Sequence, residues 1–166
     1  VILNADISGT QLFKTLGTGT LVLDGTNTLG NIQLREGVLL VNGSQSATPV
    51  TVDALDADGA TLGGDGGSSG AATVNDGTLS PGAAPGDAGV LTFVNGLTFS
   101  SAAGGTRSLI VDLNASPLSP GVNHDRVAVI GSVNLGNGIA NLVVNGIQAM
   151  PSSIALNPAR RATSVF

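Results

Sequence analysis

Three aspartates that lie close together could bind a calcium ion. Asp53, Asp56 and Asp58 occur in a short stretch that ends at Gly59, and calcium takes several oxygen ligands, which carboxylates before a turn can supply. The spacing does not match an EF-hand loop, and a solvated turn between two strands is the more typical reading of such a stretch. We therefore expect no obligatory cofactor, with calcium at these aspartates as the candidate metal site.

A second set of residues could act on polysaccharides. Enzymes that cleave glycans need clustered carboxylates, often with a basic residue, and Asp112 and Asp125 could pair with Arg107 or Arg126 if their strands are neighbours. A surface ion pair explains the same residues. The chain has no Trp or Tyr to stack on a sugar, and His124 is its only histidine. We expect no catalytic activity and keep a polysaccharide-active enzyme as a distant alternative.

Short strands must position these side chains. The run 106–116 alternates between two faces with a period of two residues, which is typical of a strand and not of a helix. Shorter apolar runs, most of them bounded by Gly, Asn, Asp or Ser, predict more strands, and no segment predicts a helix. These strands are expected at Thr20–Leu23, Asn31–Leu34, Val38–Val41, Val50–Ala54, Ala72–Val74, Leu91–Val94, Leu97–Phe99, Arg126–Ile130, Ser132–Leu135 and Ala140–Val144.

The tripeptide Val-Asn-Gly follows an apolar run at 41–43, 94–96 and 144–146. Internal repetition of this kind decides architecture. It predicts an all-β, mainly parallel solenoid of roughly four to six coils, with strands stacked about 4.8 Å apart. An antiparallel β-sandwich would also have many short strands and is the alternative. In a solenoid, Asn42, Asn95 and Asn145 could stack into a ladder, although turn residues explain them equally well.

Composition narrows the class of protein further. The chain has 166 residues, 25 Gly, no Cys, a net charge of -5 and 42% hydrophobic residues, which is too apolar for a disordered protein. Six basic residues and four Phe give no basic stripe with stacking aromatics, so we expect no nucleic-acid partner. No apolar run approaches the roughly 20 residues of a membrane span, and we expect no membrane insertion.

Gly- and Pro-rich stretches divide the chain. We predict a solenoid domain over residues 1–150, with loops near 63–70, 80–89 and 115–123. The first loop is glycine-rich, and the other two contain prolines, which lack the donor that a central strand requires. The apolar pattern fades after Met150, so residues 151–166 are expected to form an exit segment or tail.

Several segments resemble the autotransporter-associated β-strand repeat. Gly17–Thr28 is similar to the opening of that repeat, and Glu36–Gly43 resembles its closing strand. Gly59–Gly64 and Gly77–Gly82 are similar to the segments that follow, and His124–Val129 resembles a recurrent Tyr-Asp-x-Leu-x-Val segment. The resemblance covers about residues 17–146. It implies a right-handed parallel β-helix on a secreted or cell-surface protein of a Gram-negative-type bacterium.

The apolar start of the chain predicts an assembly edge. Val1, Ile2 and Leu3 carry no polar cap, although solenoid ends are normally blunted because they expose backbone and apolar side chains. We expect either a cut from a longer solenoid or an end that stacks on another copy by strand addition. Head-to-tail stacking would give an open filament.

These expectations describe a structural protein. We predict an extracellular or cell-surface solenoid, such as an adhesin passenger-like segment, a stalk or a matrix component. The alternative is a subunit of a self-assembling extracellular filament. In either case the expected partners of the protein are other copies of itself or adjoining solenoid repeats, and a host or matrix surface.

Overall fold

A computed structural model describes residues 1–14, 17–45, 48–56, 59–65, 68–84, 86–100, 105–114, 119–136 and 140–146. The predicted tail over 151–166 and the calcium candidate Asp58 lie outside these ranges. Within them the secondary structure consists of strands, with no helix. The prediction of an all-β chain is therefore confirmed for the part of the chain that the structure describes.

In these ranges seventeen strands follow one another, and most are short. The predicted strands are present: Thr20–Leu23 and Leu97–Phe99 have the expected bounds, and most of the others differ by one or two residues at their ends. Six further strands were not predicted: Ile2–Leu3, Ser8–Gly9, Leu12–Lys14, Thr28–Leu29, Ala60–Gly64 and Ser68–Ser69. The strands are β1 (Ile2–Leu3), β2 (Ser8–Gly9), β3 (Leu12–Lys14), β4 (Thr20–Leu23), β5 (Thr28–Leu29), β6 (Ile32–Leu34), β7 (Gly37–Val41), β8 (Val50–Asp53), β9 (Ala60–Gly64), β10 (Ser68–Ser69), β11 (Ala72–Pro81), β12 (Val90–Phe93), β13 (Leu97–Phe99), β14 (Arg107–Asp112), β15 (Arg126–Val129), β16 (Val133–Asn134) and β17 (Ala140–Asn145).

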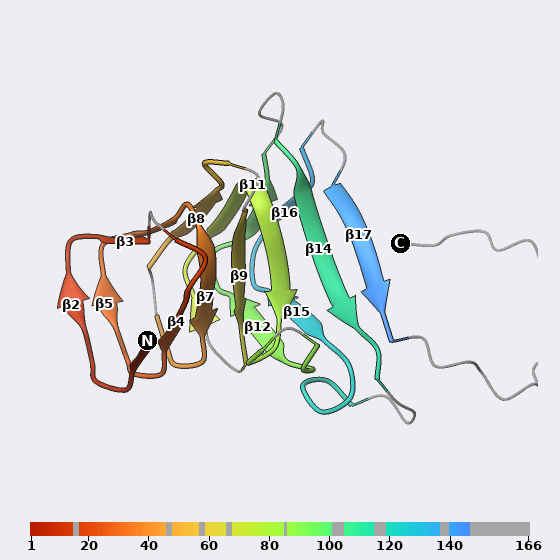
Figure 1. Ribbon diagram of the computed structural model, residues 1–166, viewed down its shortest axis with the longest axis horizontal. Helices are drawn as coiled ribbons and strands as arrows, with labels where there is room; N and C mark the ends of the chain where they lie inside the picture. The colour runs from red at the N-terminus through yellow and green to blue at the C-terminus, as the bar shows by residue number, and fades with distance from the viewer. Residues whose placement is uncertain are drawn as a thin grey trace, which may run out of the picture.

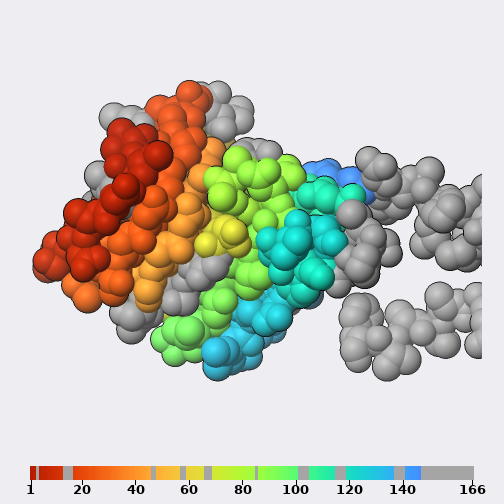
Figure 2. Space-filling view, turned by 90° about the horizontal axis from the view of Figure 1, so that it is seen from below, coloured from red at the N-terminus to blue at the C-terminus, as the bar shows by residue number. Residues whose placement is uncertain are grey.

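Parallel pairing between strands that are distant in sequence organises the fold. One ladder runs β1-β4-β7-β9-β11-β14-β17, and a second runs β3-β6-β8-β11-β13-β16. Two smaller sheets, β10-β12-β15 and β2-β5, are also parallel. In Figure 1 the strands of the first ladder succeed one another from red to blue across the molecule, and the colours follow the same order in Figure 2. The strands that pair are therefore parallel, and the antiparallel sandwich does not describe them.

Strand β11 joins the two long ladders. Its first part, Ala72–Val74, pairs with β8 and β13. Its second part pairs with β9 over Thr78–Pro81 and with β14 over Gly77–Leu79. The register shifts between Val74 and Asp76, and Gly77 has a φ of 125°. A residue with a side chain is strained at this φ, so glycine lets one strand turn from the second ladder into the first.

A column of six leucines runs through the first ladder. The parallel register places each leucine on the next strand's leucine, from β4 through β7, β9, β11 and β14 to β17. We call this set the leucine column; it consists of Leu21, Leu39, Leu62, Leu79, Leu109 and Leu142.

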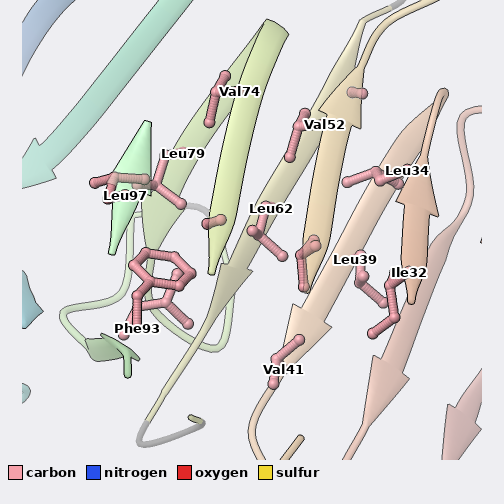
Figure 3. Close-up of a cluster of buried hydrophobic side chains, with 14 of the residues drawn as sticks. Ile32, Leu34, Leu39, Val41, Val52, Leu62, Val74, Leu79, Phe93 and Leu97 are labelled. Carbon is pink, nitrogen blue, oxygen red and sulfur yellow. The ribbon is translucent and has the colours of Figure 1, made fainter. Parts of the chain in front are cut away.

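The core lies between the ladders and is almost entirely aliphatic. Figure 3 shows Leu39, Leu62 and Leu79 of the leucine column with buried side chains from the second ladder, such as Leu34 and Val74. Phe93 and Phe99 are buried with them in the same cluster. Burying a leucine or valine removes its apolar surface from water and contributes roughly 1.5–3 kcal/mol. Because the chain has few aromatic residues, the stacked aliphatic side chains supply the main stabilisation of the core.

Buried polar side chains satisfy the backbone where strands turn. Asn27 is fully buried, its Oδ1 accepts the N–H of Ile7 at 2.8 Å, and its Nδ2 donates to the carbonyl of Gly25. The hydroxyl of Thr48 donates to the carbonyl of Leu29 at 2.8 Å. Such bonds replace the water that an exposed turn would use.

Two expected loops differ from the observed chain. The glycine-rich stretch 63–70 begins inside β9, where Gly63 and Gly64 are buried, and contains β10 near its end. In the stretch 80–89, Pro81 is the last residue of β11 and pairs with Gly64. On the other edge β14 pairs only as far as Leu79, so no ladder on that edge requires an N–H from Pro81. In the third stretch, 115–123, the described residues 119–123 lie outside the strands.

Candidate functional site

The first edge of the long ladder carries the predicted assembly residues. Strand β1 contains Ile2 and Leu3 and pairs with β4; within the described ranges its other edge is unpaired. Val1 is 81% exposed and Ile2 is 64% exposed. An exposed strand edge presents backbone groups that another strand can use. The geometry at this edge is what the assembly hypothesis needs, and the hypothesis itself stays a prediction.

The opposite edge was not predicted and is the more apolar of the two. Strand β17 pairs with β14, and among the described residues no strand pairs with its far edge. Leu142 is 64% exposed, although its partner in the column, Leu109, is partly buried against the core. Strand β15 is followed by the exposed Ile130, and β16 contains the exposed Val133. The first ladder, the second ladder and the β10-β12-β15 sheet therefore all finish with uncovered aliphatic side chains.

The calcium candidates are spread over two environments. Asp53 lies at the end of β8, where its Oδ2 is 3.6 Å from the Nη2 of Arg35 and its Cα pairs with that of Asp76. Asp56 lies in the turn that follows, and its carbonyl accepts the N–H of Gly59 at 3.2 Å. In the described part of the chain no group of three or more acidic, His or Cys residues could hold a metal. Because Asp58 is outside that part, the three-aspartate site stays a prediction.

An open groove of about 470 Å³ lies beside these aspartates. Asp56 and Asp76 line it together with small residues and the hydroxyl residues Thr78, Thr106 and Ser108. Oδ1 of Asp76 accepts the N–H of Thr106 at 2.9 Å, so this carboxylate already supports the backbone. The described lining contains no basic residue and no histidine. The titratable side chains in this described lining are those of the two aspartates.

The polysaccharide hypothesis named Asp112 and Asp125, and the structure brings these two together. Oδ2 of Asp125 accepts the N–H of Asp112 at 2.9 Å, and Oδ1 accepts the N–H of Gly89 at 2.8 Å. Asp112 is 2% exposed and Asp125 is 5% exposed. Burial raises the pKa of the Asp125 carboxyl, the two backbone donors oppose this rise, and the charge of Asp112 adds to it.

The arginines named with these aspartates make other contacts. Nη1 of Arg107 donates to the carbonyl of Asn75 at 3.4 Å, and the side chain of Arg126 is exposed at the start of β15. The Nδ1 atom of His124 is buried without a hydrogen-bond partner. Both carboxylates are almost completely buried, and that of Asp125 accepts two backbone N–H groups, which joins the end of β14 to the residue before β12.

A polar ladder on the surface was missed in part. Nδ2 of Asn42 donates to Oδ1 of Asp24 at 3.0 Å, and its Oδ1 accepts the N–H of Asp65 at 3.0 Å. Oδ1 of Asp65 in turn accepts the N–H of Val90 at 3.3 Å. The sequence hypothesis stacked Asn42 on Asn95, but the neighbours of Asn42 are aspartates. Asp24 and Asn42 each directly follow a strand and precede a glycine, a signal that could have identified this pair.

No family model, curated protein or solved structure matches this chain. Within the described ranges there is also no helix of the length and apolarity required to cross a membrane.

Proposed function

We propose that the chain is a right-handed parallel β-helix that acts as a structural segment on a bacterial cell surface or outside the cell. In this proposal it is an adhesin passenger-like segment, a stalk or a matrix component, and it catalyses no reaction. The observation that carries the proposal is the leucine column. Strands in parallel register place the same side chain at the same position from β4 to β17, an arrangement that gives rigidity along one direction.

The buried acidic residues also support a structural role. Asp112 and Asp125 are the best catalytic candidates in the sequence, and the carboxylate of Asp125 binds backbone N–H groups in the interior. The resemblance to the autotransporter-associated repeat adds the location: a passenger-type β-helix works outside the cell. In this proposal the protein functions through its shape and stiffness, and its surface binds other repeats or a host matrix.

Three measurements test this proposal together. Antibodies raised against the purified chain should label intact cells of the bacterium that makes it as strongly as permeabilised cells. Electron microscopy of the purified chain should show short rods. Labelling that requires permeabilisation would contradict the surface location, and compact round particles would contradict the β-helix. Release of unsaturated sugar products from polyuronates, lost in Asp125→Asn, would contradict the absence of catalysis.

A second candidate function is a subunit of an extracellular filament. The uncovered aliphatics at both edges of the long ladder favour it, since β1 exposes Ile2 and β17 exposes Leu142. Both strands run in the same direction within one parallel ladder, so the β17 edge of one copy and the β1 edge of the next could continue that ladder. A head-to-tail contact of this kind does not close and extends into a fibre.

Sedimentation and electron microscopy separate the filament from the single rod. A filament subunit should sediment as a concentration-dependent series of polymers. Leu142→Asp should abolish that series because a charge would enter the apolar contact. Val122→Asp is the matched control, because Val122 is 77% exposed and lies in a turn outside the strands. Removal of residues 1–6 should also block assembly. A wild-type chain that is monomeric at every concentration would exclude this candidate.

A further inference from the structure

One carboxylate, that of Asp125, connects three segments of the chain. Its Oδ1 accepts the N–H of Gly89, which directly precedes β12, and its Oδ2 accepts the N–H of Asp112, the last residue of β14. The backbone N–H of Asp125 donates to the carbonyl of Asp112 at 2.8 Å. The N–H of Arg126 donates to the carbonyl of Gly89 at 2.8 Å. We call this set of bonds the Asp125 clasp.

The clasp lies at the base of two loops. The chain leaves the first ladder after β14 and enters the β10-β12-β15 sheet at β15, and its two sides meet where Leu113 bridges His124. The N–H of Asn114 donates to the carbonyl of Asn123 at 2.7 Å, which extends the base by one residue pair. Nδ2 of Asn114 also reaches the carbonyl of Gly86 at 3.4 Å, in the segment before β12. Releasing Asp125 would therefore loosen residues 113–114 and 119–124 and the segment 86–89 together.

The clasp places two carboxylates close together in a buried site. Both carboxylates are at least nine-tenths buried, and Oδ2 of Asp112 has no hydrogen-bond partner. Two ionised carboxylates in such a site repel each other and have lost their water, which is costly unless a positive charge or a proton compensates. Of the groups that face Asp125, Asp112 on β14 is acidic and His124 on the loop lowers its pKa. On the remaining segments, Asp87 and Arg126 have exposed side chains.

We propose that the Asp112–Asp125 pair takes up one proton as the pH falls, and that this proton fastens residues 113–114 and 119–124 and the segment 86–89 to the end of β14. The proton compensates one of the two buried charges. A protonated carboxyl can donate a hydrogen bond, and the acceptor without a partner in this site is Oδ2 of Asp112. The inference concerns a pH-sensitive device in the fold and does not depend on the structural role proposed above.

The direction of the pH effect follows from linkage. Burial raises the pKa of Asp125 in the closed clasp, whereas in the opened clasp its carboxyl is solvated and has an ordinary aspartate pKa. Between these two values the closed form binds more protons than the open form. The closed clasp is therefore fully favoured below the ordinary aspartate pKa, and this advantage is lost as the pH rises through the raised pKa.

Nuclear magnetic resonance of the intact chain tests the proposal at two points. The carboxyl carbon resonance of Asp125 should titrate above the range of an exposed aspartate. The amides of Gly89 and Asp112 should be better protected from hydrogen exchange at pH 4.5 than at pH 7.5 after correction for intrinsic exchange, by up to about tenfold for each unit of raised pKa. Titration of Asp125 at or below the ordinary range would overturn the proposal, as would equal protection at the two pH values.

Three variants identify the groups responsible. Asp125→Asn removes the titrating group, and Asp112→Asn removes the repelling charge while keeping its shape, so both should weaken the pH dependence of protection at Gly89. Asp53→Asn is the matched control, because Asp53 is a half-exposed aspartate on β8, outside the clasp, and it should leave that dependence unchanged. If Asp53→Asn abolished it as well, the effect would belong to the whole fold and the proposal would be wrong. If a variant does not fold, the titration of wild-type Asp125 still decides.

Discussion

The middle of the leucine column and its end at β17 contain the same residue in opposite surroundings. Leu39, Leu62 and Leu79 are at most 1% exposed, because each lies between leucines of two neighbouring strands. Leu142 has a leucine on one side only among the described residues and is 64% exposed. An interior residue of a parallel ladder packs against residues of both neighbouring strands. A leucine at the edge has only one of these two contacts and is therefore less stabilising. Each rung is therefore stabilised by the next one along.

The largest expected effect tests this difference directly. Leu62→Ala should lower the free energy of unfolding by about 3–5 kcal/mol, because it removes buried methyl groups and leaves a cavity between two ladders. Leu142→Ala should cost less than about 1 kcal/mol in the monomer, because water already reaches this side chain. Denaturant unfolding of both variants measures the two values. Equal losses would mean that the edge is as well packed as the middle.

The next largest loss of stability is expected at a glycine in the middle of the ladder, where the backbones of two neighbouring strands approach closely. Gly64 has a φ of 136°, and a Cβ at this position would overlap the carbonyl oxygen of Val41 on β7. Gly64→Ala should therefore cost about 2–4 kcal/mol, from the strained φ together with the overlap. Gly86 also has a positive φ, of 91°, but a Cβ added there would meet no atom within 4 Å. Gly86→Ala should cost about 1 kcal/mol, from the strained φ alone.

Thermal unfolding of both glycine variants checks this expectation. If Gly86→Ala lost as much stability as Gly64→Ala, the strained φ would be the cause of both losses, and the overlap with Val41 would add nothing. A negligible loss in Gly64→Ala would instead show that β7 and β9 can move apart at no cost.

Strand positions could be predicted from the sequence because they are local. Alternating aliphatics bounded by Gly, Asn or Asp identify β4, β6, β7 and β13 with little error, since each is short and its neighbour in sequence is a turn. Parallel pairing followed from the repetition of these units. The exact register, and therefore the leucine column, depends on the number of residues between one strand of the ladder and the next. These connecting segments differ in length.

Other features depended on contacts that the sequence does not encode locally. Asn75, Asp76 and Gly77 are typical of a turn, yet β11 continues through them because both of its halves find partners on two sides. Gly63 and Gly64 were read as a loop because glycine carries no side-chain pattern, and they are buried where strands approach closely. The pairing of Asp112 with Asp125 arises because the loop between them returns to its own starting point.

The surface ladder of the middle rungs gives a smaller expected effect. Asn42→Ala should cost about 1 kcal/mol, since two exposed hydrogen bonds are lost. Asn42→Asp should cost more than Asn42→Ala, because its carboxylate still accepts the N–H of Asp65 but faces the carboxylate of Asp24. Raising the salt concentration should reduce the excess loss in Asn42→Asp, because salt screens exposed charges. An Asn42→Asp chain as stable as wild type would show that the ladder contributes little.

The smallest effect concerns the ion pair beside the predicted calcium site. The side chains of Arg35 and Asp53 are 36% and 43% exposed, and their charged atoms are 3.6 Å apart. An exposed pair at this distance gains little, because water screens the charges and two side chains lose freedom. Arg35→Met, which keeps an unbranched apolar stem but removes the charge, should therefore lower the free energy of unfolding by less than about 1 kcal/mol.

A double-mutant cycle with Asp53→Asn isolates the coupling between the two side chains, and calcium added to each variant reports on the metal. If calcium stabilised the wild type and Arg35→Met but not Asp53→Asn, Asp53 would be a calcium ligand and its bond to Arg35 a competitor for it. A calcium effect that is the same in all the variants would place the metal elsewhere, because a ligand removed from a site lowers its affinity.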